Sequence, residues 1–499
     1  MSRSPLSQSA LLERIDALDF DLDDRIRTDP PDGPLRISFR FDNDGRDDYP
    51  FSTLQGFSDW KASQKVAIFD ALRKIEAVAD VTFSQRRFGD ADIKFFRADD
   101  LEGAGGVSVF SYRIGEGRQI DLEGGSAYLS RLDLAAARNA GLVLHEIGHT
   151  LGLKHPGNYN FGDLPPPPRP YLPAAEDNTR YTIMAYEQAP DDYAEPVDLM
   201  IYDIAALQAR YGANMSHRAG DDVYGAPRAG EFKVVWDAGG YDSIQWSGDA
   251  GAVIDTRAGS FSDLGARNNF AIAYGVQIEA ARGGSGADRL IGGEGSQRLA
   301  GAGGDDRVFA GAGADRLLGG QGADLLNGGS GADVISAGLG NDRLFGQRDN
   351  DLMRGGFGDD TLRGGAGDDR LFGQAGADLL AAGGGGDMLK GGQGNDRLMG
   401  YGGADLLRGG PGADVLNGGG GNDRLTGGAG GDVFVFQRNG GDDTVSGFAP
   451  GVDHIRAPGP FGRLSITDAG DGALIGFAGG SALLVGVDAD DLSRGDFLF

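Results

Sequence analysis

The chain has 499 residues and no cysteine, and its 74 acidic against 46 basic side chains give a formal net charge of −28. This length allows two or three domains. The charge argues against a nucleic-acid-binding protein, which needs a basic surface, and fits poorly with an anionic membrane. Without cysteine there is no disulfide framework, and no apolar run is long enough to span a bilayer.

The first 222 residues mix strand and helix patterns. Residues 1–30 are polar, and they lack the apolar core of a secretory signal peptide. Apolar alternation predicts a strand over 37–41, and further strands are expected near 81–84, 93–97 and 119–122. Residues 60–79 place apolar side chains on one side of a predicted helix.

Residues 145–155 read His-Glu-Ile-Gly-His-Thr-Leu-Gly-Leu-Lys-His and hold three of the five histidines. His145 and His149 are four residues apart, so they share one face of a helix. Gly152 can take the left-handed conformation that ends a helix, which lets the chain bring His155 to the same point. Three neutral imidazoles with one open position are the layout of a catalytic zinc site. Two core histidines beside a surface carboxylate are the alternative, which the added Gly152 and His155 disfavour.

The residue after the first histidine, Glu146, has a predicted role of its own. A zinc ion here would lower the pKa of its bound water from about 16 to about 7. Glu146 would then take the proton of that water and pass it to the leaving amine. Each histidine also needs a hydrogen-bond partner on its other ring nitrogen, and the sequence does not identify these partners.

This stretch resembles the serralysin family of secreted bacterial metalloproteases, which are metzincins. The family pattern continues with Pro-Gly and a later Met-x-Tyr turn, matched here by residues 156–157 and 184–186. The resemblance implies one zinc held by His145, His149, His155 and Tyr186, with Met184 in the turn beneath it. It also implies that Tyr186 moves aside and steadies the oxyanion. Glu187 stands where the family usually has Trp, which leaves the shape of the nearby subsite open. Residues 203–214 resemble the helix that closes the family's catalytic domain.

From Gly283 to Val435 the chain repeats every nine residues, in 17 units. The sixth position is Asp in 16 units and Gln297 in the other, and the eighth position is apolar in all of them. This pattern is typical of the calcium-binding parallel β-roll of RTX proteins. It predicts a six-residue turn, a three-residue strand with the eighth side chain pointing inward, and two units per coil. A flexible Gly-rich linker is the alternative, but a linker needs neither invariant position. The layers at Gln297, which lacks the charge, and at residues 347–349, which replace the Gly pattern, are expected to lack an ion or to be irregular.

Carboxylates and turn carbonyls supply the hard oxygen ligands that calcium prefers. The expected carboxylates are those of Asp288, Asp306, Asp315, Asp324, Asp333, Asp342, Asp351, Asp360, Asp369, Asp378, Asp387, Asp396, Asp405, Asp414, Asp423 and Asp432. The resemblance adds the second- and fourth-position carbonyls, for example those of Gly284, Gly286, Gly329 and Gly331. It also implies calcium ligands near the domain junction at Arg218, Gly220, Asp237, Gly239, Gly240, Asp242, Gln277 and Glu279. A plain hairpin turn is the alternative reading of residues 236–242. Without calcium the repeats should not fold, because glycine is costly to order and the carboxylates repel.

The expected fold is multidomain, with an α+β metzincin catalytic domain followed by an all-β parallel β-roll (RTX) and a β-sandwich-like C-terminal domain. Its parts are a propeptide over 1–30, the zinc protease domain over 31–222, a β-rich junction over 223–282, the roll over 283–435 and a cap over 436–499. The last four residues, Asp-Phe-Leu-Phe, resemble the family's uncleaved signal for type I (ABC) secretion machinery. A final β-strand is the alternative for these four residues.

These features together predict a secreted, extracellular, monomeric zinc endopeptidase of broad specificity, acting on proteins and peptides, with several structural calcium ions. Neither nucleic acid nor stable membrane insertion is expected, and a proteinaceous inhibitor is left open as a partner. One alternative is a non-enzymatic RTX calcium-binding surface or adhesion protein with a degenerate protease domain. Another is a different hydrolase or lyase carried by an RTX tail.

Overall fold

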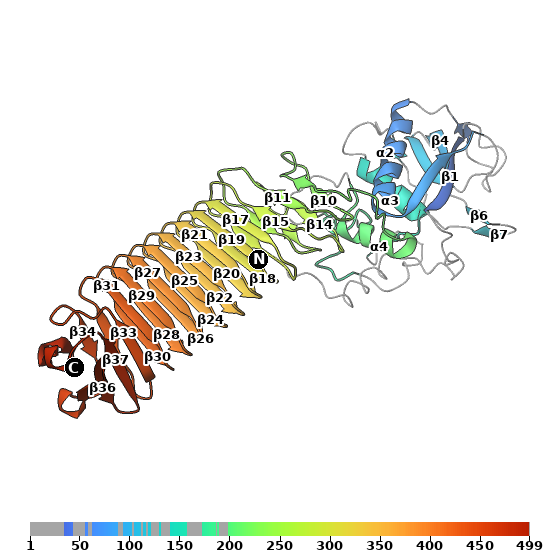
Figure 1. Ribbon diagram of the computed structural model, residues 1–499. Helices are drawn as coiled ribbons and strands as arrows, with labels where there is room; N and C mark the ends of the chain where they lie inside the picture. Colours follow the sequence, from blue (N-terminus) through green and yellow to red (C-terminus); the bar gives the residue numbers. More distant parts are fainter. Residues whose placement is uncertain are drawn as a thin grey trace.

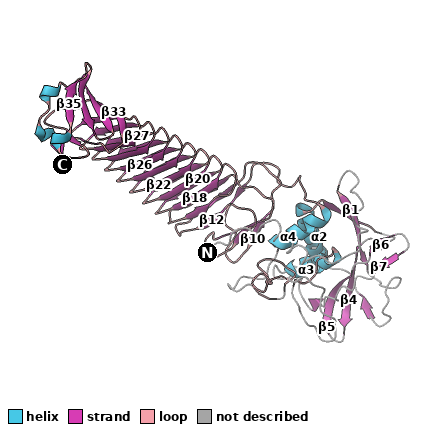
Figure 2. Ribbon diagram, turned by 90° about the horizontal axis from the view of Figure 1, so that it is seen from below, coloured by secondary structure: helices cyan, strands magenta, loops and turns pink. Residues whose placement is uncertain are grey.

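The computed structural model is elongated, with a mixed head, a long parallel β-solenoid and a cap following one another along its axis (Figure 1). It describes residues 34–42, 55–57, 62–87, 93–101, 104–110, 113–115, 118–120, 129–130, 140–156, 172–185, 187–188 and 198–498. The expected propeptide therefore lies outside the described residues. Helices occur in the head and the cap, and strands fill the solenoid between them (Figure 2).

The head contains a six-stranded sheet in the order β3-β1-β4-β5-β8, with β2 also paired to β4. The strands β3, β1 and β4 are parallel, whereas β2, β5 and β8 run antiparallel to their neighbours. A separate hairpin joins β6 and β7. The bounds are β1 Leu35–Asp42, β2 Gln55–Phe57, β3 Val81–Gln85, β4 Ile93–Leu101, β5 Ala104–Phe110, β6 Arg113–Gly115, β7 Arg118–Ile120 and β8 Leu129–Ser130.

Three helices belong to the described part of the head: α2 (Ala62–Val78), α3 (Ala140–Thr150) and α4 (Ile201–Tyr211). Helix α2 buries Ile68, Leu72 and Ile75, spaced by four and three residues as one helix face requires. Its Phe69 ring contacts Phe39 of β1 edge to face at 5.5 Å between ring centres. The predicted helix over 60–79 and the strand over 37–41 are thus confirmed in α2 and β1. None of the described helices combines the length and the apolar character needed to cross a bilayer.

Short strands of the junction lead from α4 into the solenoid. They are β9 Val223–Tyr224, β10 Lys233–Val235, β11 Ser243–Gln245, β12 Val253–Asp255, β13 Phe261–Ser262, β14 Phe270–Ile272 and β15 Ala280–Arg282. Three of them, β10, β14 and β13, form their own small sheet, while the others belong to the two long sheets that continue into the solenoid. Aromatic rings link junction and head, because Tyr202 of α4 stacks on Tyr181 at 5.3 Å and on Tyr274 at 6.4 Å.

The solenoid consists of two long parallel sheets whose strands alternate along the chain. Each residue pairs with the residue 18 positions later, as Leu299 does with Leu317, which confirms two nonapeptides per coil. The strands are β16 Arg289–Ile291, β17 Arg298–Gly303, β18 Arg307–Ala312, β19 Arg316–Gln321, β20 Leu325–Ser330, β21 Val334–Leu339, β22 Arg343–Arg348, β23 Leu352–Phe357, β24 Thr361–Ala366, β25 Arg370–Ala375, β26 Leu379–Gly384, β27 Met388–Gln393, β28 Arg397–Gly402, β29 Leu406–Pro411, β30 Val415–Gly420, β31 Arg424–Ala429 and β32 Val433–Val435.

The eighth-position side chains form the core of the solenoid. From Leu290 to Phe434 all of them are buried, which confirms the predicted inward stack. The strands are mostly six residues long and not three as predicted, because pairing continues into the first three residues of the next unit. Gln347 and Arg348 pair regularly in β22, and Gln347 and Asp349 take the positive φ angles, 88° and 71°, of a left-handed backbone. The strand pairing in this layer is therefore regular, and the expected lack of an ion there stays a prediction.

The cap continues both solenoid sheets. Its strands are β33 Gly441–Ser446, β34 His454–Arg456, β35 Ser465–Asp468, β36 Gly472–Phe477, β37 Gly480–Val485 and β38 Phe497–Leu498, and β35, β36 and β37 are antiparallel neighbours. The C-terminal strand β38 pairs with β34, and the side chain of Phe497 is buried. The alternative reading of the last residues as a β-strand thus agrees with the structure. A separate β-sandwich stays a prediction.

Candidate metal centres

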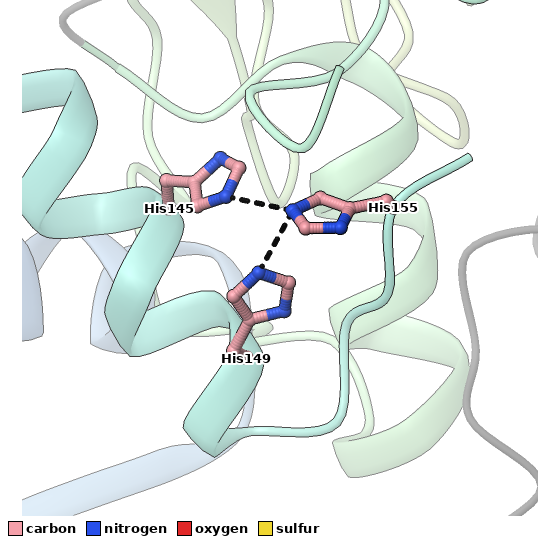
Figure 3. A group of neighbouring side chains, drawn as sticks. All are labelled: His145, His149 and His155. Atoms are coloured by element: carbon pink, nitrogen blue, oxygen red, sulfur yellow. Dashed lines mark hydrogen bonds between the residues drawn. The ribbon is translucent and has the colours of Figure 1, made fainter. Parts of the chain in front are cut away.

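Three histidine rings converge between helix α3 and the turn that follows it (Figure 3). His145 and His149 project from one face of α3, and His155 reaches them from the chain beyond the helix. The Nε2 atom of His155 lies 3.1 Å from Nε2 of His145 and 3.1 Å from Nε2 of His149. In the part of the chain that the structure describes, two groups of His, Asp or Glu side chains lie close enough together to hold a metal ion. These three histidines are one of them.

Backbone carbonyls hold two of these rings by their other nitrogen. His145 Nδ1 lies 2.7 Å from the carbonyl oxygen of Ile183, and His149 Nδ1 lies 2.8 Å from that of Leu153. A carbonyl oxygen only accepts, so both Nδ1 atoms carry the proton and donate it. In the neutral rings both Nε2 atoms are therefore bare lone pairs. Ile183 and Leu153 are the partners that the sequence could not identify.

The electrostatics of the site suit a cation. Two bare lone pairs face His155 Nε2, which can offer at most one proton between them. A tetrahedral ion bound at 2.0–2.1 Å sets its nitrogen ligands about 3.3 Å apart, close to the observed separations. Burial lowers the pKa of all three rings, that of His149 to about 3 and that of His155 to about 2, and their mutual repulsion lowers the last two further. The rings are thus neutral at pH 7 and fit zinc.

The turn that brings His155 back depends on Gly152. Its φ is +92°, which favours glycine, and an added Cβ would lie 2.8 Å from Cζ of Arg210. The next residue of α4, Tyr211, donates its hydroxyl to the carbonyl of Leu151 at 2.8 Å. The end of α4 therefore packs on the turn between the second and third histidine.

The predicted Met-turn lies directly beneath α3. Met184 is fully buried, and a Cβ added to Gly148 would lie 3.0 Å from its sulfur. The carboxylate of Asp203, at the start of α4, binds this turn: it accepts the Thr182 hydroxyl at 2.5 Å and the Ile183 N–H at 2.9 Å. Burial raises the pKa of Asp203 to about 7 against the effect of these donors. Asp203 has no predicted role in the sequence, although an acid in the apolar first turn of a helix is a signal for one.

Two predicted catalytic residues cannot be placed in this way. Glu146 belongs to α3 next to His145, but its side chain is not among those described. Tyr186 lies outside the described residues. Their roles stay predictions.

The other candidate metal centre is a group of three aspartates at the junction. Ligand atoms of Asp222, Asp237 and Asp242 lie within 4.8 Å of one another. One carboxylate oxygen of Asp242 is buried with no hydrogen-bond partner in the described chain, and burial together with the neighbouring acids raises the pKa of this residue to about 6. Tyr224 donates its hydroxyl to Asp237, and the Asp242 N–H donates to Glu279 at 2.7 Å.

This arrangement brings together three of the predicted junction residues, Asp237, Asp242 and Glu279. Asp222 was missed, because it lies outside the segments that were matched to the family. The predicted calcium-binding roles of Arg218, Gly220, Gly239 and Gly240 stay predictions. Gln277 is exposed, and its role also stays a prediction.

The aspartates of the repeats form two columns along the solenoid. In each column one carboxylate oxygen accepts the N–H of the aspartate one coil earlier, as Asp369 does from Asp351 at 2.8 Å. The other oxygen is buried and has no hydrogen-bond partner in the described part of the chain. This holds for Asp306, Asp315, Asp324, Asp333, Asp342, Asp351, Asp360, Asp369, Asp378, Asp387, Asp396, Asp405, Asp414, Asp423 and Asp432.

Such oxygens need a partner, because an unpaired charge is costly to bury. Burial raises the pKa of these carboxyl groups, for example that of Asp351 to about 7 and that of Asp378 to about 6. Rows of buried carboxylate oxygens without donors fit a hard cation such as calcium, which takes oxygen ligands. The columns also extend past the repeats, since Asp443 accepts from Asp423 and Asp453 accepts from Asp432. Those two residues follow no nine-residue period, so the repeat pattern does not predict them.

Part of this chain is similar to known proteins. Residues 213–458 match the family described as Peptidase M10 serralysin C terminal. Metallopeptidase AprA of Pseudomonas marginalis is 35% identical over an alignment of 274 positions, and the match covers 48% of this chain and 56% of that protein. Metalloprotease AprA of Pseudomonas entomophila (strain L48) is 33% identical over 52% of this chain and 59% of its own length. Serralysin of Proteus mirabilis is 42% identical over 29% of this chain and 34% of its own length. The chain thus spans about half the length, or less, of these relatives.

Proposed function

We propose that this chain, which resembles the serralysin-type metalloproteases, is a secreted zinc-dependent endopeptidase that hydrolyses proteins and peptides with broad specificity. The observation that carries the proposal is the convergence of three Nε2 atoms at 3.1 Å, with the tautomers of His145 and His149 set by backbone carbonyls. Metallopeptidase names among the similar proteins support the same reaction class.

In the proposed mechanism His145, His149 and His155 hold the zinc ion, and Tyr186 is a further ligand by resemblance. Zinc, when bound, supplies Lewis-acid chemistry that activates water and polarises the substrate carbonyl. The carboxylate of Glu146 takes a proton from the attacking water and gives it to the nitrogen of the leaving amine. The Ile183 carbonyl keeps the ring of His145 in place, and Met184 lies against Gly148 of the same helix. The head then has the metzincin fold, with a propeptide at 1–30.

Calcium is the proposed structural ion. Rows of buried, unpartnered aspartate oxygens support this role in the solenoid, and the acidic group of Asp222, Asp237 and Asp242 supports it at the junction. Weak calcium sites fill at extracellular concentrations, with dissociation constants of about 0.1–1 mM, and stay empty in the cytosol. The chain would then pass through type I secretion machinery unfolded and fold outside the cell.

Cleavage of an unstructured protein in millimolar calcium tests the proposed activity, with wild type beside Glu146→Ala and Glu146→Gln and the zinc content of each measured. We expect zinc in all three proteins and cleavage by wild type alone. Glu231→Gln is the matched control, because Glu231 is an exposed glutamate of the junction, and it should cleave like wild type.

Peptide cleavage by either Glu146 variant would contradict the proposed mechanism. Zinc binding without cleavage by wild type, after removal of residues 1–30, would point to the non-enzymatic calcium-binding protein.

A further inference from the structure

Gln297 occupies the sixth position of the second repeat, where every other repeat has aspartate. Its side-chain amide is engaged at both ends. The oxygen Oε1 accepts the N–H of Gly293 at 2.8 Å. The nitrogen Nε2 donates to the hydroxyl of Thr256 at 2.8 Å and to the carbonyl of Ile278 at 2.6 Å. We call these four residues the Gln297 layer.

Asp315 follows Gln297 in the same column, one coil later, and its side chain is only partly hydrogen-bonded. Asp315 Oδ1 accepts the N–H of Gln297 at 2.7 Å, but its Oδ2 is buried and has no partner in the described chain. A cation could complete Asp315, because an ionised carboxylate offers only acceptors. The amide of Gln297 is neutral, and its nitrogen is a donor that cannot bind a cation. Its oxygen already accepts a backbone donor.

The hydrogen bonds of Gln297 also join separate coils. Ile278 precedes β15, the strand one coil earlier in the same sheet, and Thr256 follows β12 in the other sheet. Thr256 in turn donates its hydroxyl to the carbonyl of Ile291 at 3.1 Å. Nε2 of Gln297 therefore makes the bridge between coils that a cation would otherwise make.

At the same coil, the other column also lacks an unpartnered side-chain oxygen. Asp288 is the one sixth-position aspartate of the roll with both oxygens bonded to backbone N–H groups. It accepts from Ala252 and from Gly284, each at 2.6 Å. Both sides of the first coil, residues 283–300, are thus closed by hydrogen bonds of the chain itself.

We propose that the first coil of the roll binds no calcium at the Gln297 layer and that the amide of Gln297 takes the place of the ion. This inference rests on the proposed calcium binding by the later coils. The layer separates the junction acids Asp222, Asp237 and Asp242 from the ladder that begins at Asp306 and Asp315. Calcium can then fill the junction and the roll independently, in two transitions.

The test is a crystal structure of the full chain in saturating calcium, with anomalous difference maps that locate calcium directly. We expect peaks along both columns from Asp306 and Asp315 onward, and no peak within the Gln297 layer. Gln297→Asp should gain a peak there. The matched variant Asp315→Gln, which carries the same amide one coil later, should lose the peak beside residue 315.

Each outcome decides one point. A calcium peak in the Gln297 layer of wild type, or an unchanged map in Gln297→Asp, would overturn the inference and leave calcium binding by the roll intact. A map without peaks along either column would overturn calcium binding itself and the inference with it. Neither result depends on zinc or on peptide cleavage, so failure here is distinct from failure of the proposed activity.

Should the variants not crystallise, calcium-bound chains can be counted in solution by equilibrium dialysis. Gln297→Asp should then bind at least one ion more than wild type, and Asp315→Gln at least one ion fewer. Equal numbers for wild type and Gln297→Asp would contradict the inference.

Discussion

The carboxylate of Asp203 accepts the backbone N–H of Ile183 at 2.9 Å, and the carbonyl of the same Ile183 faces Nδ1 of His145 at 2.7 Å. One residue of the Met-turn thus connects a buried acid of α4 to a proposed zinc ligand. Asp203 also accepts the N–H of Met200 at 2.8 Å, so its carboxylate links the Met-turn to the start of α4. Helix α4 is therefore connected to the His145 ring through Ile183.

Asp203→Asn should weaken zinc binding. The amide nitrogen would meet the N–H and hydroxyl donors of the Met-turn, and the Ile183 carbonyl would shift away from His145. Loss of such supporting contacts costs about 10–100-fold in metal affinity, and we expect about 10-fold for this indirect contact. Competition with a chelator measures it. Asp198→Asn is the control, since Asp198 precedes α4 and interacts with Lys74 and the Leu199 N–H. Equal affinity in the two variants would contradict the role of Asp203.

Gly152→Ala should destabilise the head and lower its zinc content. A left-handed backbone costs an L-residue about 1–2 kcal/mol, and the new methyl group would press on Arg210. Gly230→Ala separates the two effects, because Gly230 has a similar φ of +81° and open space around it. Thermal unfolding and zinc analysis of both variants provide the comparison. A loss of zinc in Gly230→Ala as well would show that backbone strain alone explains the result.

The calcium-free solenoid should be more stable in mild acid than at neutral pH. Burial raises the pKa of Asp306, Asp324 and Asp360 to about 7, whereas in the unfolded chain such groups titrate near 3.8. The folded chain therefore binds more protons between these values, and its free energy of unfolding falls as the pH rises through that window. Circular dichroism in chelator at about pH 5 and about pH 8 measures the folded fraction. More structure at the higher pH would contradict the expectation.

Asp369→Asn should raise the calcium concentration needed for folding, and Asp368→Asn should not. The two residues are adjacent, but Asp369 is buried with one unpartnered oxygen, whereas the exposed Asp368 accepts the N–H of Gly386 at 2.8 Å. A calcium titration followed by circular dichroism gives both midpoints. Equal midpoints would mean that the buried column is not where calcium binds.

Leu398→Ala should destabilise the calcium-loaded roll by about 2–5 kcal/mol, the usual cost of a large cavity in a packed core. Leu398 is fully buried in the eighth-position stack between Leu380 and Leu416, with which it pairs in neighbouring coils. Exposed Met388, at a seventh position, is the control, and Met388→Ala should change stability little. Denaturant unfolding in saturating calcium compares the variants.

The sequence by itself determined the features that repeat or stay local. The nine-residue period predicted the buried eighth positions and the two columns of aspartate, because each unit contacts copies of itself. The spacing of His145, His149, Gly152 and His155 predicted the convergence of the rings, because a helix and one turn decide it.

Only the tertiary structure decided which distant groups complete these sites. Ile183 lies 38 residues from His145, and Asp203 lies 20 residues beyond Ile183. Asp443 and Asp453 extend the columns although they follow no nine-residue period, because the register of neighbouring coils aligns them, and Asp222 joins the junction group. Gln297 looked like a weakened repeat until its partners Thr256 and Ile278 were known. A pattern in sequence records what each residue can donate or accept, but folding alone brings a distant partner within hydrogen-bond distance.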